Sequence, residues 1–325
     1  LPDGGKLSPL FSPCVRYFPM SDIKIDPSEI PFPTSPVQPA LIDGNKEITF
    51  RCHRGIDCWN ACCSNIDISL TPYDILRLKK RLDMTSGEFL LKYTLPYEME
   101  MNGIAGVKLK PIEDGTACQF MKPEGCSVYE DRPTACRYYP VALLSMRRQD
   151  QFTDTHAYAL VKEPHCHGHH EPRPITVEAY RQEQGLEEYD RLGRGWRQLI
   201  LKKKSSGPTV GKPTPRSLQL FFMACYDIDR FREFVTTDNF NDIYDLPAET
   251  REQIGRDDLV LMEFSFQLMR QVLFNEMTIP IKPDAMEKRL ARKQEREKRL
   301  DEIAAKIGPL DDLREDPNDK YKQLD

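Results

Sequence analysis

Apolar residues recur at helical spacing through much of the second half of the chain. One predicted helix has an apolar face formed by Leu218, Phe221, Phe222, Cys225 and Ile228. A second apolar helix, rich in Phe and Met, is predicted over residues 259–274, and more mixed helices over 176–184 and 186–201. Because Cys225 falls on an apolar helical face, we expect its thiol to pack in the core rather than to bind a metal.

Helix-start signals mark two short helices in the first half. Thr71-Pro72-Tyr73-Asp74 combines an N-cap threonine, a proline at the first helical position and an early acid, which predicts a helix ending near Arg81. Thr85-Ser86-Gly87-Glu88 forms a capping box ahead of a second helix. We expect both helices to pack beneath the cysteine-rich segments. Apolar residues alternate with lysines over 103–111, a pattern that predicts a β-hairpin.

Composition divides the chain into four parts. Residues 1–45 form a predicted extended arm or linker, because nine of the 26 prolines lie in the first 40 positions. Residues 46–172 contain most of the cysteines. Residues 173–280 are predicted to be helical, with a basic flexible loop at 202–216. Residues 281–325 form a charged helical tail whose acidic end is expected to be disordered.

Charge and hydropathy exclude several classes of protein. The chain has 46 basic and 51 acidic residues and a formal net charge of −5, so no basic field attracts nucleic acid. No apolar stretch approaches the roughly 18 residues of a membrane span, and the N-terminal segment has no secretory signal pattern. We therefore expect a cytoplasmic protein that binds neither a membrane nor nucleic acid.

Cysteine is concentrated in one part of the chain. Two of the ten cysteines, Cys14 and Cys225, lie apart from the others. In a chain without a secretory signal, clustered cysteines indicate metal ligands or redox groups more often than structural disulfides. The candidate metal ligands are the remaining eight: Cys52, Cys58, Cys62, Cys63, Cys118, Cys126, Cys136 and Cys166.

The spacing of these cysteines leaves alternatives open. Adjacent side chains diverge, so Cys62 and Cys63 can serve two neighbouring metals or one polynuclear cluster, unless Cys63 is a core residue. The turn residues Lys122-Pro123-Glu124-Gly125 predict a hairpin that brings Cys118 and Cys126 together.

Charged and imidazole groups adjoin two of the cysteines. Arg132 and Arg137 flank Cys136, where their charges favour a thiolate; the alternative is that both form surface salt bridges. The tract His165-Cys166-His167-Gly168-His169-His170 offers imidazole ligands to a mixed site. The alternative is a solvated loop in which Cys166 is the only ligand.

Ligand chemistry alone does not separate zinc from iron. All-thiolate sites suit both zinc and iron–sulfur clusters. The compact C-x2-C pairs typical of zinc sites are absent from the chain. Eight thiolates also exceed the four that one zinc ion takes, which indicates two sites or a polynuclear cluster. The pattern therefore favours iron–sulfur over zinc.

Several cysteine motifs occur together between residues 48 and 170. They are Phe50-Arg51-Cys52, the pair Cys62-Cys63, the segment from Cys118-Gln119-Phe120 to Cys126-Ser127-Val128-Tyr129, Arg132-Pro133-x-x-Cys136-Arg137, and Cys166-His167-Gly168. In combination they resemble the YkgJ-like cysteine-cluster family, described as a zinc- or iron-chelating domain with eight cysteines. The wide spacing of Cys52, Cys58 and Cys62 leaves open which of the first two takes the family's first ligand position.

The resemblance implies a metal-binding domain without naming a reaction. Relatives include flagellin lysine methylases, in which a similar cysteine region is thought to hold an iron–sulfur cluster. This chain has no recognisable glycine-rich loop for S-adenosylmethionine, so we do not carry the methylase activity over. It also has no P-loop, no dinucleotide fingerprint and no assignable Ser-His-Asp set, so catalytic residues stay unassigned.

These observations predict a helix-rich α+β protein. Its first part is a loop-rich, metal-stabilised cysteine-cluster domain, followed by an α-helical C-terminal extension. The predicted function is to bind iron, as an iron–sulfur cluster, or zinc. One alternative is an enzyme that uses the cluster for protein modification or redox chemistry, and another is a metal-delivery protein. The C-terminal helices are a candidate surface for a protein partner.

Overall fold

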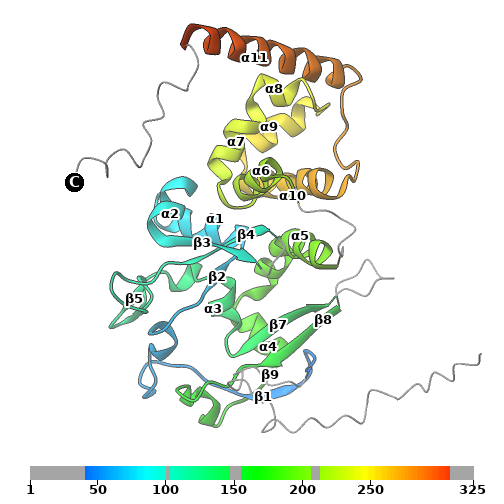
Figure 1. The fold of residues 1–325 in the computed structure, drawn as a ribbon. Coiled ribbons are helices and arrows are strands. Elements are labelled where there is room, and N and C mark those ends of the chain that lie inside the picture. The colour runs from blue at the N-terminus through cyan, green and yellow to red at the C-terminus, as the bar shows by residue number, and fades with distance from the viewer. Residues whose placement is uncertain (1–40, 100–102, 147–154, 206–212, 308–325) are drawn as a thin grey trace, which may run out of the picture. The chain divides into compact units, whose positions relative to one another are not determined.

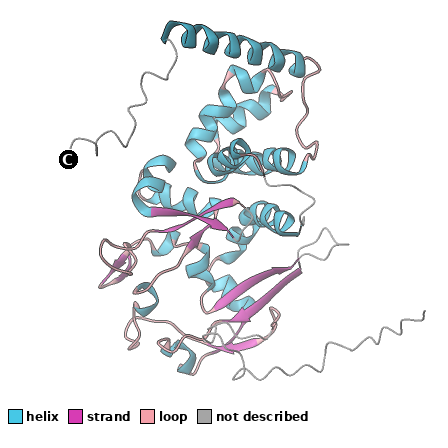
Figure 2. Cartoon of the chain, viewed as in Figure 1, coloured by secondary structure: helices cyan, strands magenta, loops and turns pink. Residues whose placement is uncertain are grey.

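The computed structural model describes residues 41–99, 103–146, 155–205 and 213–307 (Figure 1). Most of the predicted arm, Cys14 and the acidic end therefore lie outside the described residues. Within those ranges, small antiparallel sheets and short helices come first in the chain, and longer helices follow (Figure 2). The fold is α+β and helix-rich, as the sequence predicted.

Four small antiparallel sheets lie in the described part of the chain. The three-stranded sheet has the order β2-β4-β3 and consists of β2 (Ser69–Leu70), β3 (Thr94–Met99) and β4 (Ile104–Leu109). The two-stranded sheets are β1 (Glu47–Thr49) with β9 (Pro174–Thr176), β5 (Met121–Lys122) with β6 (Gly125–Cys126), and β7 (Val141–Met146) with β8 (Thr155–Leu160). The β1–β9 pair joins the start of the cysteine-rich region to the segment that follows its last cysteine.

The prediction of a hairpin within residues 103–111 is wrong. These residues supply a single strand, β4, in which Val107 and Leu109 are buried, and β3 is its partner. β3 gave no strand signal because only Thr94 of its side chains is buried and it contains Pro96. A residue without an N–H group is tolerated there because β3 is an edge strand.

Both predicted capping boxes are present. α1 (Pro72–Arg81) begins after Thr71, whose Oγ1 accepts the Asp74 N–H at 3.1 Å while the Asp74 carboxylate accepts the Thr71 N–H at 2.8 Å. α2 (Ser86–Tyr93) begins in the same way after Thr85. Local sequence alone is therefore enough to position the start of both helices.

The remaining helices include the four that were predicted between residues 173 and 280. They are α3 (Thr134–Tyr138), α4 (Val177–Glu183), α5 (Leu186–Ser205), α6 (Pro215–Tyr226), α7 (Ile228–Thr236), α8 (Asp238–Asn241), α9 (Ala248–Arg256), α10 (Asp258–Phe274) and α11 (Ala285–Ile307). The predicted loop at 202–216 begins too early, because α5 continues to Ser205. Lys203 is buried there, and Lys202 forms an ion pair with Glu276, so packing sustains the helix.

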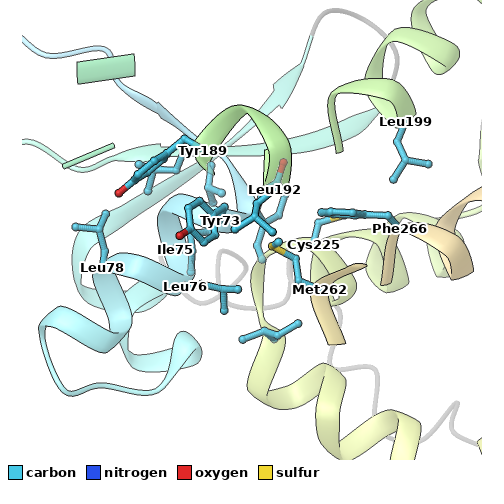
Figure 3. Packing of buried hydrophobic residues seen from close by; sticks show 14 of the residues in the cluster. Tyr73, Ile75, Leu76, Leu78, Tyr189, Leu192, Leu199, Cys225, Met262 and Phe266 are labelled. Atoms are coloured by element: carbon cyan, nitrogen blue, oxygen red, sulfur yellow. The ribbon is translucent and has the colours of Figure 1, made fainter. Parts of the chain in front are cut away.

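One hydrophobic core connects α1, α5, α6 and α10 (Figure 3). Tyr73 of α1 packs edge-on against Tyr189 of α5, with ring centroids 4.9 Å apart. Cys225 of α6 is 3 % exposed and belongs to the same core, as expected. A Cβ at Gly195 of α5 would lie 2.6 Å from Cδ2 of Phe266, so glycine is what allows α5 and α10 to approach.

The tail helix α11 is joined to the preceding helices near its start. Asp242, which follows α8, forms an ion pair with Arg292 and another with Lys288 at 3.8 Å. Ala285 is buried. Four large apolar side chains of α11 are exposed: Met286, Leu290, Leu300 and Ile303. None of the helices in the described ranges is long and apolar enough to cross a membrane.

Candidate metal centre

The eight clustered cysteines lie on loops and short elements. Those in short elements are Cys62 and Cys63 in the 3₁₀ turn η2 (Ala61–Cys63), Cys126 in β6 and Cys136 in α3. Those in loops are Cys52, Cys58, Cys118 and Cys166, the last of which precedes the 3₁₀ turn η4 (His167–His170). All eight are free thiols, and most are partly buried.

The first cysteine loop folds back against the turn that follows Cys166. The Arg51 N–H donates to the Gly168 carbonyl at 3.0 Å. The His167 N–H donates to the Cys58 sulfur at 3.2 Å. These two bonds bring together segments that are more than 100 residues apart, and with them the cysteines Cys52, Cys58 and Cys166.

Backbone hydrogen bonds join a second group of cysteines to η2. The Cys118 N–H donates to the Cys63 carbonyl at 2.8 Å, and the Met121 N–H donates to the Cys118 carbonyl at 3.1 Å. Met121 pairs with Cys126 across the β5–β6 hairpin. The hairpin predicted from residues 122–125 is therefore confirmed.

Helix α1 holds α3, and with it Cys136, in place. Thr134, the first residue of α3, donates its N–H and its hydroxyl to Oδ1 of Asp74, at 2.8 and 2.7 Å. Arg77 of α1 binds Asp131 at 2.6 Å. The expectation that α1 packs beneath the cysteine segments is thus confirmed. α2 contacts the cysteine-rich segment through Tyr93, whose ring centroid lies 5.0 Å from that of Phe120, and its Ser86 N–H donates at 2.7 Å to Asp229 of α7.

Cys62 and Cys63 lie where the two groups of cysteines meet. Their sulfurs are 3.9 Å apart. The hydrogen bond between the two thiols lowers the pKa of Cys62 to about 7. The same bond, together with burial and the charge on Cys62, raises the pKa of Cys63. The pair therefore holds one proton tightly and gives up the other readily.

Backbone N–H groups reach three of the sulfurs in a repeated pattern. Burial raises the pKa of Cys118, Cys126 and Cys166, and in each case the N–H two residues further on opposes this by donating to the sulfur. The donors are Phe120, Val128 and Gly168. Hydrogen bonds to sulfur are one means by which proteins stabilise and tune metal–thiolate centres.

The predicted effect of the two arginines on Cys136 is wrong. Burial is the largest influence on Cys136 and raises its pKa, and the neighbouring thiols of Cys118 and Cys126 raise it further. The charge of Arg132 instead lowers the pKa of Cys52 and of Cys126.

The alternative prediction, that Arg132 and Arg137 form surface salt bridges, is also wrong. Arg132 and Arg137 are both buried. The Arg132 guanidinium donates to the Tyr129 carbonyl, and the Arg137 guanidinium donates to the Gln184 carbonyl, each at 2.7 Å. Arg137 also lies over the ring of Tyr189, 4.2 Å from its centroid. Their main contribution is to hold the loop before α3 against the start of α5.

Two histidines of the tract around Cys166 interact with protein groups. Nε2 of His169 lies 3.0 Å from the Val161 carbonyl oxygen, and burial lowers the pKa of this imidazole. Nε2 of His165 lies 3.5 Å from a carboxylate oxygen of Glu163. These contacts occupy nitrogen atoms that a mixed cysteine–histidine site would use.

The thiols are neighbours, but they do not surround a single point. In the described residues, no group of three or more His, Cys, Asp or Glu side chains is placed to hold a metal ion as it stands. Two buried groups nevertheless fit a thiolate centre: the Tyr139 hydroxyl, which interacts with the Cys166 thiol, and Trp59 Nε1, which has no hydrogen-bond partner in the described residues. Tyr139 adjoins Cys166, and Trp59 packs against Gly125, beside Cys126. Metal-bound sulfur is an acceptor that suits both groups.

Sequence patterns did not reveal these supporting residues. Asp74 gave only a helix-capping signal. The N–H groups that donate to sulfur belong to the backbone, and a backbone group has no sequence pattern of its own. The glycine of Cys166-His167-Gly168 was an available signal. A Cβ at Gly168 would lie 3.0 Å from the Arg51 carbonyl oxygen and 2.7 Å from Cε2 of Phe50, so glycine alone permits this close approach.

The cysteine-rich part of the chain matches one family model. Residues 51–189 match the model of a family named CxxCxxCC, whose description is "Putative zinc- or iron-chelating domain". Comparison with curated proteins gives no match, and neither does comparison with solved structures. The matched range includes all eight clustered cysteines, although Cys52, Cys58 and Cys62 are spaced more widely than the family's name specifies. Residues 51–189 are therefore similar to this zinc- or iron-chelating family.

Proposed function

We propose that residues 51–189 hold iron, as iron–sulfur, through the eight clustered cysteines. The observation that carries this proposal is the arrangement of the thiols. They come from loops far apart in sequence, and backbone N–H groups already donate to their sulfurs. Such donors stabilise the thiolates that a metal requires.

The number of thiols supports iron–sulfur over a single zinc ion. One tetrahedral zinc takes four ligands, whereas eight cysteines lie in the matched range. An iron–sulfur cluster contributes iron and sulfide atoms of its own between the thiolates, and so can be held by thiolates that do not surround a single ion.

The role that follows for the metal is to bind together the loops of this domain. The segments that carry the cysteines have few buried side chains, whereas α1 and the sheet β2-β4-β3 contribute many to the hydrophobic core. A bound centre stabilises such loops because its binding free energy is added to the free energy of folding.

Anaerobic purification followed by iron, zinc and acid-labile sulfide analysis tests the proposal. We expect iron and sulfide in comparable amounts, and a broad visible absorption that bleaches on reduction. Cys225→Ala serves as the control, because this cysteine lies in the core, and its metal content should equal that of the wild type. A protein that contains zinc and no sulfide would show that the bound metal is zinc rather than iron. A protein that holds neither metal would overturn it.

A further inference from the structure

We infer that α11 is an interaction surface for a second copy of this chain, and that the two copies of the helix pair antiparallel. This inference concerns the helix that ends the described part of the chain (Figure 1). It goes beyond the proposed metal centre and does not depend on it.

One side of α11 carries a row of exposed side chains spaced alternately four and three residues apart. This is the spacing of the a and d positions of a heptad, which lie along one side of a helix. The large apolar members of the row are Met286, Leu290 and Leu300, with exposed fractions of 73 %, 57 % and 56 %. A contiguous row of this kind marks an interaction site, whereas apolar residues exposed singly do not. We call the row the seam of α11: Met286, Leu290, Lys293, Glu297, Leu300 and Ala304.

The seam faces away from the helices that precede α11. Lys288 and Arg292 both bind Asp242, which follows α8. They occupy the f and c positions of the same heptad, on the side of the helix opposite to a and d. The attachment therefore leaves the seam accessible along its length of about 27 Å, at a rise of 1.5 Å per residue.

Charge indicates what covers the seam. Its centre consists of Lys293 and Glu297, which form an ion pair with Nζ and Oε1 3.7 Å apart. A purely apolar partner would bury both groups without new counter-charges, which is costly. The partner that fits supplies an acid opposite Lys293 and a base opposite Glu297. A second α11 that runs antiparallel supplies both, because it presents the same two residues in reverse order.

The same antiparallel register also matches the apolar residues. When Lys293 of one helix lies opposite Glu297 of the other, Leu290 lies opposite Leu300, and Met286 opposite Ala304. Each layer then joins an a position to a d position. A parallel pair would instead place each seam residue opposite its own copy, so that lysine faces lysine and glutamate faces glutamate. Such like-charge contacts disfavour the parallel arrangement.

Charges beside the seam make the expected dimer reversible. In the antiparallel register, Glu287 of one helix lies on the same side of the seam as Asp301 of the other, so two acids face each other. Arg296 likewise approaches its own copy across the symmetry axis. These repulsions and the short seam limit affinity, and we expect dissociation in the micromolar range rather than an obligate dimer.

Sedimentation velocity of the full chain tests the surface, at concentrations from micromolar to hundreds of micromolar. We expect the wild type to shift from monomer to dimer over this range. The double variant Leu290→Glu, Leu300→Glu should stay monomeric, because four carboxylates would then lie in the seam. Leu91→Glu is the matched control, since Leu91 of α2 is 86 % exposed but lies outside the seam, and it should dimerise as the wild type does. Circular dichroism verifies that each variant keeps its helical content.

Charge substitutions test the antiparallel orientation. Lys293→Glu should weaken dimerisation by about tenfold, because two opposite-charge contacts become like-charge contacts. Adding Glu297→Lys to it should restore the wild-type affinity, since the exchanged charges are again opposite. Asp301→Lys should strengthen the antiparallel dimer, because the new ammonium faces Glu287. In a parallel pair the same substitution would weaken association, because residue 301 would lie beside Arg296.

Three results would overturn the inference. A wild-type protein that is monomeric at all concentrations would refute self-association. A dimer that persists in the Leu290→Glu, Leu300→Glu variant, with helical content unchanged, would show that the interface lies elsewhere. Weaker association of Asp301→Lys, without rescue by the exchange of Lys293 and Glu297, would refute the antiparallel pairing.

Discussion

Asp74 and Thr134 are joined by two hydrogen bonds that connect α1 to the helix carrying Cys136. Both the N–H and the hydroxyl of Thr134 donate to Oδ1 of Asp74, at 2.8 and 2.7 Å. The other carboxylate oxygen accepts the Thr71 N–H and caps α1. Because Asp74 is fully buried, its carboxylate has no water to replace these donors. One side chain therefore fixes both a helix start and the position of a candidate ligand.

Substitution of Asp74 should weaken both folding and metal retention. Asp74→Ala leaves three donors buried without an acceptor, so we expect the free energy of unfolding to fall by about 3 kcal/mol. We also expect faster transfer of metal to an external chelator, because α3 is no longer held. Urea denaturation and a competition assay measure the two effects.

Glu88→Ala provides the matched control for Asp74→Ala. Glu88 caps α2 as Asp74 caps α1, but Glu88 is exposed and its capping bonds stay within Thr85. Its loss should destabilise the protein much less than Asp74→Ala and leave metal transfer unchanged. If the two variants behave alike, Asp74 has only a capping role.

Two cysteines of the chain should respond to substitution in opposite ways. Cys136→Ser replaces a soft sulfur with an oxygen that does not ionise readily, so bound metal should fall sharply. Cys225→Ala removes a core side chain that is 3 % exposed, and should cost about 1 kcal/mol without loss of metal. Metal analysis and thermal denaturation of both variants check this. Equal metal loss in the two would contradict the separation of roles.

Metal removal should loosen particular loops rather than the whole first half. Residues 70–109 contribute Leu78, Phe89 and Val107 to the core, so they should hold their structure without metal. The cysteine loops 51–66, 112–128 and 163–170 should become fast in hydrogen exchange after chelation under reducing conditions. Unchanged exchange in these loops after complete metal removal would show that metal does not order them.

Local signals explain which parts of the fold the sequence could predict. Thr71 and Thr85 predict where two helices begin, because capping depends only on residues three positions apart. The β5–β6 hairpin is equally local. β3 was missed because it is an edge strand in which only one side chain is buried. In the sequence, Gly195 only lowers the predicted stability of a helix. The structure shows why glycine is needed, because a larger residue there would collide with Phe266.

The candidate site was only partly predictable for the same reason. Cysteine clustering identifies the eight thiols, but their grouping depends on contacts between distant segments, such as Arg51 with Gly168 and Cys63 with Cys118. Arg132 illustrates the limit. Its position near Cys136 in sequence suggested an effect on that thiol, yet its charge acts on Cys52 and Cys126 after folding.

Two helical glycines should differ in their tolerance of alanine. At Gly255 in α9 a Cβ would meet no atom within 4 Å, so Gly255→Ala should stabilise the protein by up to about 1 kcal/mol. At Gly195 the Cβ would lie 2.6 Å from Phe266, and Gly195→Ala should destabilise it by about 1–3 kcal/mol. Thermal denaturation of the two variants and the wild type measures both changes in stability. Stabilisation by both would mean that α5 and α10 can move apart freely.

The junction of α1, α2 and α7 should give the protein a specific sensitivity to acid. Burial alone raises the pKa of Asp229, but the Lys79 ammonium at 2.7 Å and the Ser86 N–H at 2.7 Å outweigh it and hold the pKa below its usual range. A carboxyl whose pKa is lowered by folding stabilises the protein above its unfolded pKa, about 3.9, and this contribution is lost as the pH falls further. Asp229→Asn should therefore destabilise the protein at pH 7, with the difference from wild type shrinking below about pH 4. Urea denaturation across this range measures the difference, with exposed Asp301→Asn as the control. A difference that stays constant with pH would show that the Asp229 charge contributes nothing to the junction.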